Sequence, residues 1–80
     1  MTNTKIEQHV IEKVKQKRAE AKMTQMDLAI ALDVSNGFIG KLESPKYKTK
    51  YNLNHINKLA EIFNCSPQDF LPINYYKENE

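Results

Sequence analysis

Apolar residues recur along the chain at the spacing of helices, and no stretch alternates apolar and polar residues as a half-buried strand would. The first helical segment spans residues 4–22, where Thr4 and Glu7 have the spacing of a capping box. The expected apolar face of this segment consists of Ile6, Val10, Val14 and Ala21. The sequence therefore predicts a chain that begins with a long helix.

Two short helices are predicted next, over residues 25–32 and 36–43. Thr24 caps the first and Ser35 caps the second, and three residues, Asp33 to Ser35, separate them. A connection this short prevents the two helices from stacking in line. Their apolar positions are Met26, Leu28, Ala29 and Leu32 in the first, and Ile39 and Leu42 in the second.

Ser44 and Pro45 end this part, and an exposed lysine-rich loop leads to Tyr51. A fourth helix, capped by Asn52 or Asn54, is predicted to run to about Phe63 with Leu53, Ile56, Leu59, Ala60 and Phe63 apolar. A fifth opens at Ser66 and Pro67, and Pro72 stops it after one or two turns. We expect an all-α fold, a compact bundle of about five short helices in one domain over residues 1–80, with a core at about 5–72 and a tail at 73–80.

The positive charge is concentrated in one segment, although the net charge is only +2. Residues 36–58 contain five lysines and one glutamate, whereas the rest of the chain contains seven basic and nine acidic residues. A local basic patch is typical of phosphate contact, and a solvated surface is the alternative. The chain has one cysteine and no apolar run of membrane or signal-peptide length, so we expect a cytoplasmic protein.

Few residues suggest catalysis or metal binding. His9, His55 and Cys65 are the only soft ligands, and their spacing is unlike that of a zinc site. The chain has no glycine-rich phosphate loop, and a small helical core offers no cleft in which to assemble a nucleophile with its base. We expect no enzyme activity, no cofactor and no metal, and we interpret Cys65 as a core or helix-junction residue.

Three segments together resemble the lambda-repressor-like family of helix-turn-helix domains, of the Cro and phage-repressor (C1, XRE) type. They are Lys17-Arg18 at the end of the first helix, TQMDLAIALDVSNGFIGKLES, and LNHINKLAEIFNCSPQDFL. The resemblance extends from about Val14 to Leu71. It implies a central helix-turn-helix whose second helix, residues 36–43, lies in the DNA major groove.

The outward face of that second helix supplies the candidate base contacts. With Ile39 and Leu42 turned inward, the outward positions are Asn36, Gly37, Gly40 and Lys41, with Phe38 at the margin. Asn36 suits adenine and Lys41 suits guanine, whereas Phe38 is either partly buried or in contact with thymine methyl groups. The two glycines either let the backbone approach the groove or leave the helix ordered only on DNA.

The resemblance also implies roles for residues around that helix. Gln25 would bond a DNA phosphate and brace Asn36, and Arg18 would form a partly buried structural ion pair with Glu43. Asp33 stands where the family usually has a left-handed glycine, which predicts a slight loss of stability. The loop expected to contact the DNA backbone contains Lys46, Tyr47, Lys48, Lys50 and Tyr51.

The leading hypothesis is a bacterial or phage-encoded transcriptional regulator, a repressor that binds a palindromic operator in double-stranded DNA as a homodimer. The alternative is a protein-interaction module on the same scaffold, for example an antitoxin-like partner binder. The tail either frays or helps to form the dimer. The expected dimer surface consists of Phe70, Leu71, Ile73, Tyr75 and Tyr76.

Overall fold

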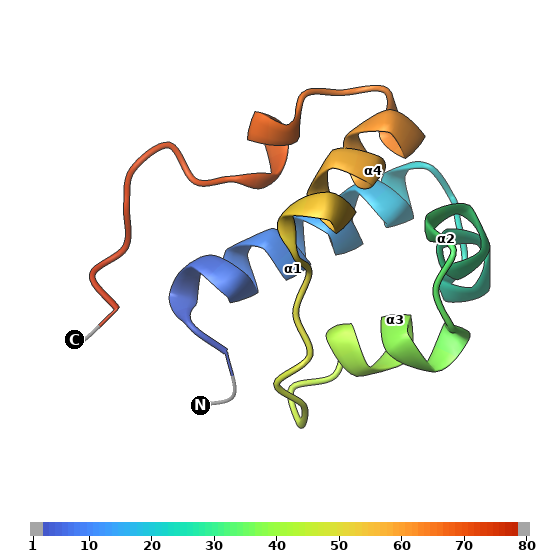
Figure 1. Ribbon diagram of the computed structural model, residues 1–80, viewed down its shortest axis with the longest axis horizontal. Helices are drawn as coiled ribbons and strands as arrows, with labels where there is room; N and C mark the ends of the chain where they lie inside the picture. Colours follow the sequence, from blue (N-terminus) through green and yellow to red (C-terminus); the bar gives the residue numbers. More distant parts are fainter. Residues whose placement is uncertain (1–2, 79–80) are drawn as a thin grey trace.

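The computed structural model describes residues 3–78, so residues 1, 2, 79 and 80 of the predicted domain and tail lie outside the described residues. Within that range the fold is all-helical and contains no strand. Its elements are α1 (Lys5–Glu20), α2 (Gln25–Leu32), α3 (Asn36–Leu42), α4 (Leu53–Phe63) and a 3-10 turn, η1 (Pro67–Phe70). Figure 1 shows α1 through the middle of the molecule, with α2 and α3 grouped at the end away from the two termini.

The all-α prediction is confirmed, but the fifth helix is a single 3-10 turn. Ser66 caps this turn and Pro67 occupies its first position. Leu71 then adopts extended backbone angles, φ −104° and ψ 151°. The cause is Pro72, because a proline pushes the residue before it out of the helical region. Four α-helices and one short turn therefore replace the expected five helices.

Side-chain caps fix where the helices begin. Thr4, Thr24, Ser35 and Asn52 each accept a hydrogen bond from the backbone N–H three residues ahead. Asn52, and not Asn54, caps α4. The end of α1 was predicted two residues too late, because the helix stops at Glu20 and Lys22 has a left-handed φ of 58°.

All four helices and η1 contribute to one core. The largest fully buried side chains are Phe70, Ile11, Leu28, Ile39, Leu59 and Val14. The sequence prediction missed Ile11, because α1 turns a broader face inward than the spacing from Val10 to Val14 indicated. It was wrong for four apolar residues that are exposed, namely Ile6, Ala21, Met26 and Leu53.

The turn between α2 and α3 depends on a left-handed residue. Asp33 has φ 62° and ψ 47°, and its N–H donates to the carbonyl oxygens of Ala29 and Ile30. The N–H of Val34 also bonds the Ala29 oxygen, at 3.0 Å. This reversal ends α2 and lets Ser35 start α3 against it, so that the two helices pack on each other.

The described part of the tail returns to the start of α1. The Glu78 carboxylate accepts hydrogen bonds from the backbone N–H groups of Lys5 and Ile6, at 2.7 and 3.0 Å. Tyr76 Oη lies 3.1 Å from His9 Nδ1. Both described ends of the chain therefore lie at the same end of the molecule (Figure 1).

We predict that Asp33→Gly raises the free energy of unfolding by about 0.5–1 kcal/mol, because glycine adopts left-handed angles without a Cβ clash. Urea denaturation measures the change. Asp33→Ala is the matched control and is expected to destabilise, since alanine keeps the clash and lacks the local hydrogen bonding of aspartate. Equal stability of the glycine and alanine variants would show that the turn stores no strain.

Candidate nucleic-acid interface

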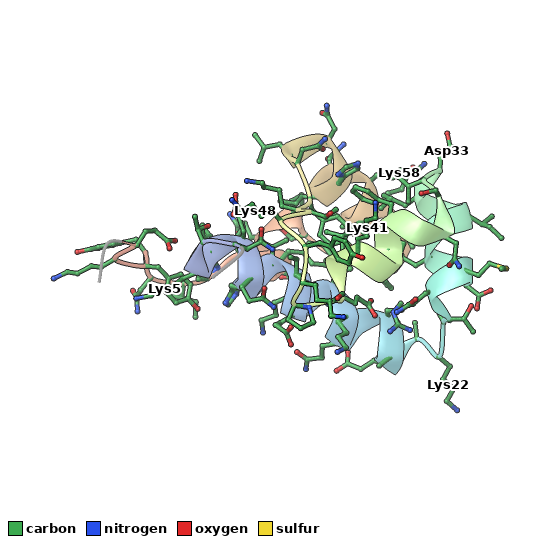
Figure 2. All side chains as sticks on the ribbon, turned by 90° about the horizontal axis from the view of Figure 1, so that it is seen from below. Lys5, Lys22, Asp33, Lys41, Lys48 and Lys58 are labelled. Atoms are coloured by element: carbon green, nitrogen blue, oxygen red, sulfur yellow. The ribbon has the colours of Figure 1, made fainter. Side chains whose placement is uncertain are left out.

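One face of α3 is free of the protein core. Ile39 and Leu42 are 0% and 2% exposed, whereas Asn36, Gly37 and Lys41 lie on the exposed side. Seen from below in Figure 2, α3 and the loop after it lie on the near side of the molecule, and Lys41 and Lys48 are on this side. The structure thus brings Lys41 of α3 together with the basic loop, residues 46–51.

Phe38 does not belong to this outward face. Its side chain is half-buried and packs against the core. The ring lies 5.3 Å from the His55 ring and 6.4 Å, edge-on, from the Tyr51 ring. The structure favours the interpretation of Phe38 as a packing residue, and the candidate base contact through its ring is not supported.

The fold itself does not require the two glycines of α3. A Cβ on Gly37 would come no closer than 4.0 Å to Ser35 Oγ, and one on Gly40 would come no closer than 3.8 Å to Gln25 Oε1. Both distances are ordinary van der Waals separations, and neither glycine has a positive φ. The glycines leave part of the outward face without side chains, so Asn36 and Lys41 are the polar side chains exposed there.

A buried carboxylate anchors the end of α3. Glu43, the C-cap of α3, accepts hydrogen bonds from Arg18 Nε at 2.9 Å and Arg18 Nη2 at 2.8 Å. The Arg18 and Glu43 side chains are only 16% and 5% exposed. Arg18 Nη1 also donates to the Met23 carbonyl oxygen at 2.8 Å. The bonds to Glu43 raise the pKa of Arg18.

Gln25 joins this carboxylate instead of bracing the first residue of α3. Gln25 Nε2 donates to Glu43 Oε1 at 3.0 Å, and no hydrogen bond joins Gln25 to Asn36 within the described residues. The expected brace is therefore wrong for this structure. Because Gln25 is the first residue of α2, its bond instead links the start of α2 to the end of α3.

The loop after α3 divides into exposed and buried parts. Lys46, Tyr47, Lys48 and Lys50 are exposed, as a phosphate-contacting role requires. Lys41 Nζ lies 5.6 Å from the centre of the Tyr47 ring, which joins α3 to the loop by a cation–π contact. Tyr51 is 9% exposed, and burial raises its pKa well above the usual range. Tyr51 is therefore a core residue and not a DNA contact.

Two contacts of the loop have no signal in the sequence. Lys50 Nζ lies 2.9 Å from Glu7 Oε2, and Asn3 Nδ2 donates to the Thr49 carbonyl oxygen at 3.3 Å. The partners are more than 40 positions apart along the chain, so no local spacing could have indicated them. These contacts hold the loop against the start of α1.

The described residues were also compared with the requirements of a metal site, a reactive thiol and a membrane-spanning helix. Residues 3–78 contain no group of three or more His, Cys, Asp or Glu side chains placed to hold a metal ion. Cys65 is a free, half-buried thiol packed against the core, and burial raises its pKa. None of the described helices combines the length and apolar character needed to cross a membrane.

Comparison with known proteins places the chain in a family. Residues 13–74 match the family model of the Cro/C1-type HTH DNA-binding domain. The match covers more than half of the chain and extends from the second half of α1 through η1. The chain therefore belongs to the Cro/C1-type helix-turn-helix family, whose members are DNA-binding domains and not enzymes, and the resemblance found in the sequence is confirmed. Searches of curated proteins and of solved structures returned no match.

We predict that Arg18→Met lowers the free energy of unfolding by about 3 kcal/mol, because it leaves the Glu43 carboxylate buried without its cation. The double variant Arg18→Met, Glu43→Leu is expected to recover most of this loss, since it removes the unpaired charge as well. Urea unfolding of the wild type, both single variants and the double variant measures the coupling. Additive losses would contradict a dependence of Glu43 on Arg18.

The stability of the α4 start is expected to depend on pH through His55. The Asn52 N–H donates to His55 Nδ1 at 3.1 Å, so this nitrogen must be unprotonated. Burial lowers the pKa of His55 from its ordinary value of 6.5. The folded state then binds the proton more weakly than the unfolded state, so the free energy of unfolding falls as the pH drops below 6.5.

His55→Gln is the matched control, because glutamine at this position retains an acceptor for the capping box but does not titrate. Unfolding measured from pH 8 down to about pH 5 is expected to show a flatter profile for this variant than for the wild type. All other titratable groups are present in both proteins, so the difference between the two profiles isolates the contribution of His55. Identical profiles would exclude His55 as the titrating group.

Proposed function

We propose that this protein is a sequence-specific transcriptional regulator, a repressor that binds a palindromic operator as a homodimer. The observation that supports this best is the exposed face of α3, where Asn36 and Lys41 stand beside the core residues Ile39 and Leu42. A helix presented in this way fits the major groove, where asparagine pairs with adenine and lysine donates to guanine. Family membership supports DNA as the ligand.

The surroundings of α3 support contact with the DNA backbone. Lys46, Tyr47 and Lys48 are exposed on the loop that Lys41 joins through the Tyr47 ring. Cations and hydroxyl groups there would bond phosphates and orient the domain without selecting a sequence. We assign Gln25 a phosphate contact as well, donated by the second N–H of the Nε2 amide that bonds Glu43.

The length of α3 argues for two copies on the operator. Seven residues of helix reach only a few base pairs, and two half-sites give useful specificity. The exposed apolar residues of the tail suit a dimer surface, and they are Leu71, Ile73, Tyr75 and Tyr76. The prediction that Phe70 belongs to this surface is wrong, because its side chain is 0% exposed and lies in the core.

A protein-interaction module is the second candidate. It is favoured by Ile73 and Tyr75, which are 101% and 83% exposed on a tail that lies away from α3. Apolar contact with a partner depends weakly on salt, whereas binding to DNA falls steeply as salt rises. Salt dependence therefore separates the two candidates.

We predict that selection of bound fragments from sheared genomic DNA enriches a two-fold symmetric site, with half-site centres about one or more helical turns apart. On that site, Lys41→Ala is expected to raise the Kd by about tenfold, since one base contact contributes roughly 1–3 kcal/mol. Lys5→Ala removes the same charge at the far end of the molecule and is the matched control (Figure 2). It should change the Kd much less.

Enrichment of a non-palindromic site would contradict the homodimer. Equal losses in the Lys41 and Lys5 variants would show that Lys41 acts only through its charge. If no sequence is enriched over random duplex, the protein-interaction candidate becomes the better one.

A further inference from the structure

An ion pair holds the basic loop against α1. Its loop member is Lys50, one of the candidate phosphate contacts. Glu7 Oε2 and Lys50 Nζ are 2.9 Å apart, with side chains 25% and 53% exposed. The neighbouring loop residue, Thr49, is held by Asn3 through a hydrogen bond of 3.3 Å. Two adjacent loop residues are thus tied to the N-terminal part of the fold.

Glu7 is fixed in place independently of Lys50. Its Oε1 accepts a hydrogen bond from the Thr4 N–H at 2.9 Å, and its own N–H donates to Thr4 Oγ1 at 3.3 Å. The bond from the Thr4 backbone, followed by the bond from Lys50, lowers the pKa of Glu7. The carboxylate is therefore ionised at neutral pH and remains beside the loop even when Lys50 moves.

In the described part of the chain, Lys50 is paired with a carboxylate, unlike Lys46 and Lys48 of the same loop. Within residues 3–78, Lys46 and Lys48 have no carboxylate within 4.0 Å of the ammonium group, whereas the charge of Lys50 is neutralised by Glu7. A carboxylate and a phosphate accept hydrogen bonds from the same ammonium group and carry the same sign of charge. Glu7 and a DNA phosphate would thus compete for Lys50.

We propose that Glu7 acts as an intramolecular substitute for a DNA phosphate, which withholds Lys50 from the duplex and weakens binding. This inference rests on the proposed function, because it requires that the loop faces DNA. An ion pair this exposed is weak, so Glu7 lowers the affinity by a small factor and does not abolish binding. Glu7 sets the strength of backbone contact without taking part in the choice of sequence.

The test uses Glu7→Gln, which removes the charge while glutamine keeps the acceptor needed for the capping box. The probe is a short, fluorescein-labelled duplex of random sequence, titrated at several concentrations of KCl. We expect the Kd at low salt to fall about two- to fivefold, as expected for release of a weak surface ion pair. The slope of log K against log salt should become steeper by about 0.9, which corresponds to one more phosphate contact.

A double-mutant cycle separates competition for Lys50 from a general change in charge. In a Lys50→Ala background, Glu7→Gln should leave the Kd unchanged, whereas in a Lys48→Ala background it should still tighten binding about two- to fivefold. Glu12→Gln, an exposed acid elsewhere on α1, measures the effect of net charge alone. Thermal unfolding of each variant checks that the fold is retained.

Four results would overturn the inference. Equal tightening in the Lys50→Ala background would assign the effect to net charge, and weaker binding by Glu7→Gln would show that Glu7 positions Lys50 for DNA. An unchanged Kd in the Glu7 variant, with normal selection of an operator by the wild type, refutes the inference alone. Failure of the wild type to bind any duplex refutes the proposed function, and this inference with it.

Discussion

The arrangement of the helices depends on the hydrogen bonds that the buried Glu43 carboxylate accepts. It lies at the C-terminal end of α3 and accepts hydrogen bonds from Arg18 on α1 and Gln25 on α2. A carboxylate 5% exposed is costly to bury unless each oxygen is bonded, and here the two oxygens share three hydrogen bonds. The same bonds that satisfy the charge therefore fix α3 relative to α1 and α2, which sets the angle at which its outer face meets a ligand.

A second set of contacts supports α3 from the side of α4. Phe38, Tyr51 and His55 form a cluster of rings with centroids 5.3 to 6.4 Å apart. Tyr51 belongs to the end of the basic loop and His55 to the first turn of α4, so the cluster joins three consecutive parts of the chain. The exposed face of α3 is thus held by a polar anchor at one end and an aromatic cluster beside it.

In the proposed interface, the residues that would choose a sequence lie apart from those that would supply charge. Asn36 and Lys41 project from a helix that is fixed by Glu43, whereas the loop lysines are carried on irregular backbone. Glu7 and Asn3 tie that loop to α1, and the tail residue Glu78 bonds the first N–H groups of the same helix. The start of α1 is therefore the point where the tail, the N-terminal segment and the loop meet.

Local hydrogen bonds made much of the fold predictable. The sequence predicts Thr4, Thr24 and Ser35 as caps, and Asn52 as one of two candidates, because a cap and its partner are only three residues apart. The bounds of α2 matched for the same reason. The family resemblance likewise rests on spacing within one continuous segment. The inward spacing of Ile39 and Leu42 left Asn36, Gly37 and Lys41 exposed as expected, whereas Gly40 is half-buried.

Tertiary contacts decided what local patterns could not. Ile11 and Phe70 are buried because other elements cover them. Leu53 is also strongly apolar, but it is 80% exposed because none of the described elements covers it. Gln25 bonds Glu43 and Lys50 bonds Glu7 across separations of 18 and 43 positions along the chain. The sequence determined which segments become helices, since helix starts and stops are short-range, whereas the packed structure determined which side chains are buried and which charges are paired.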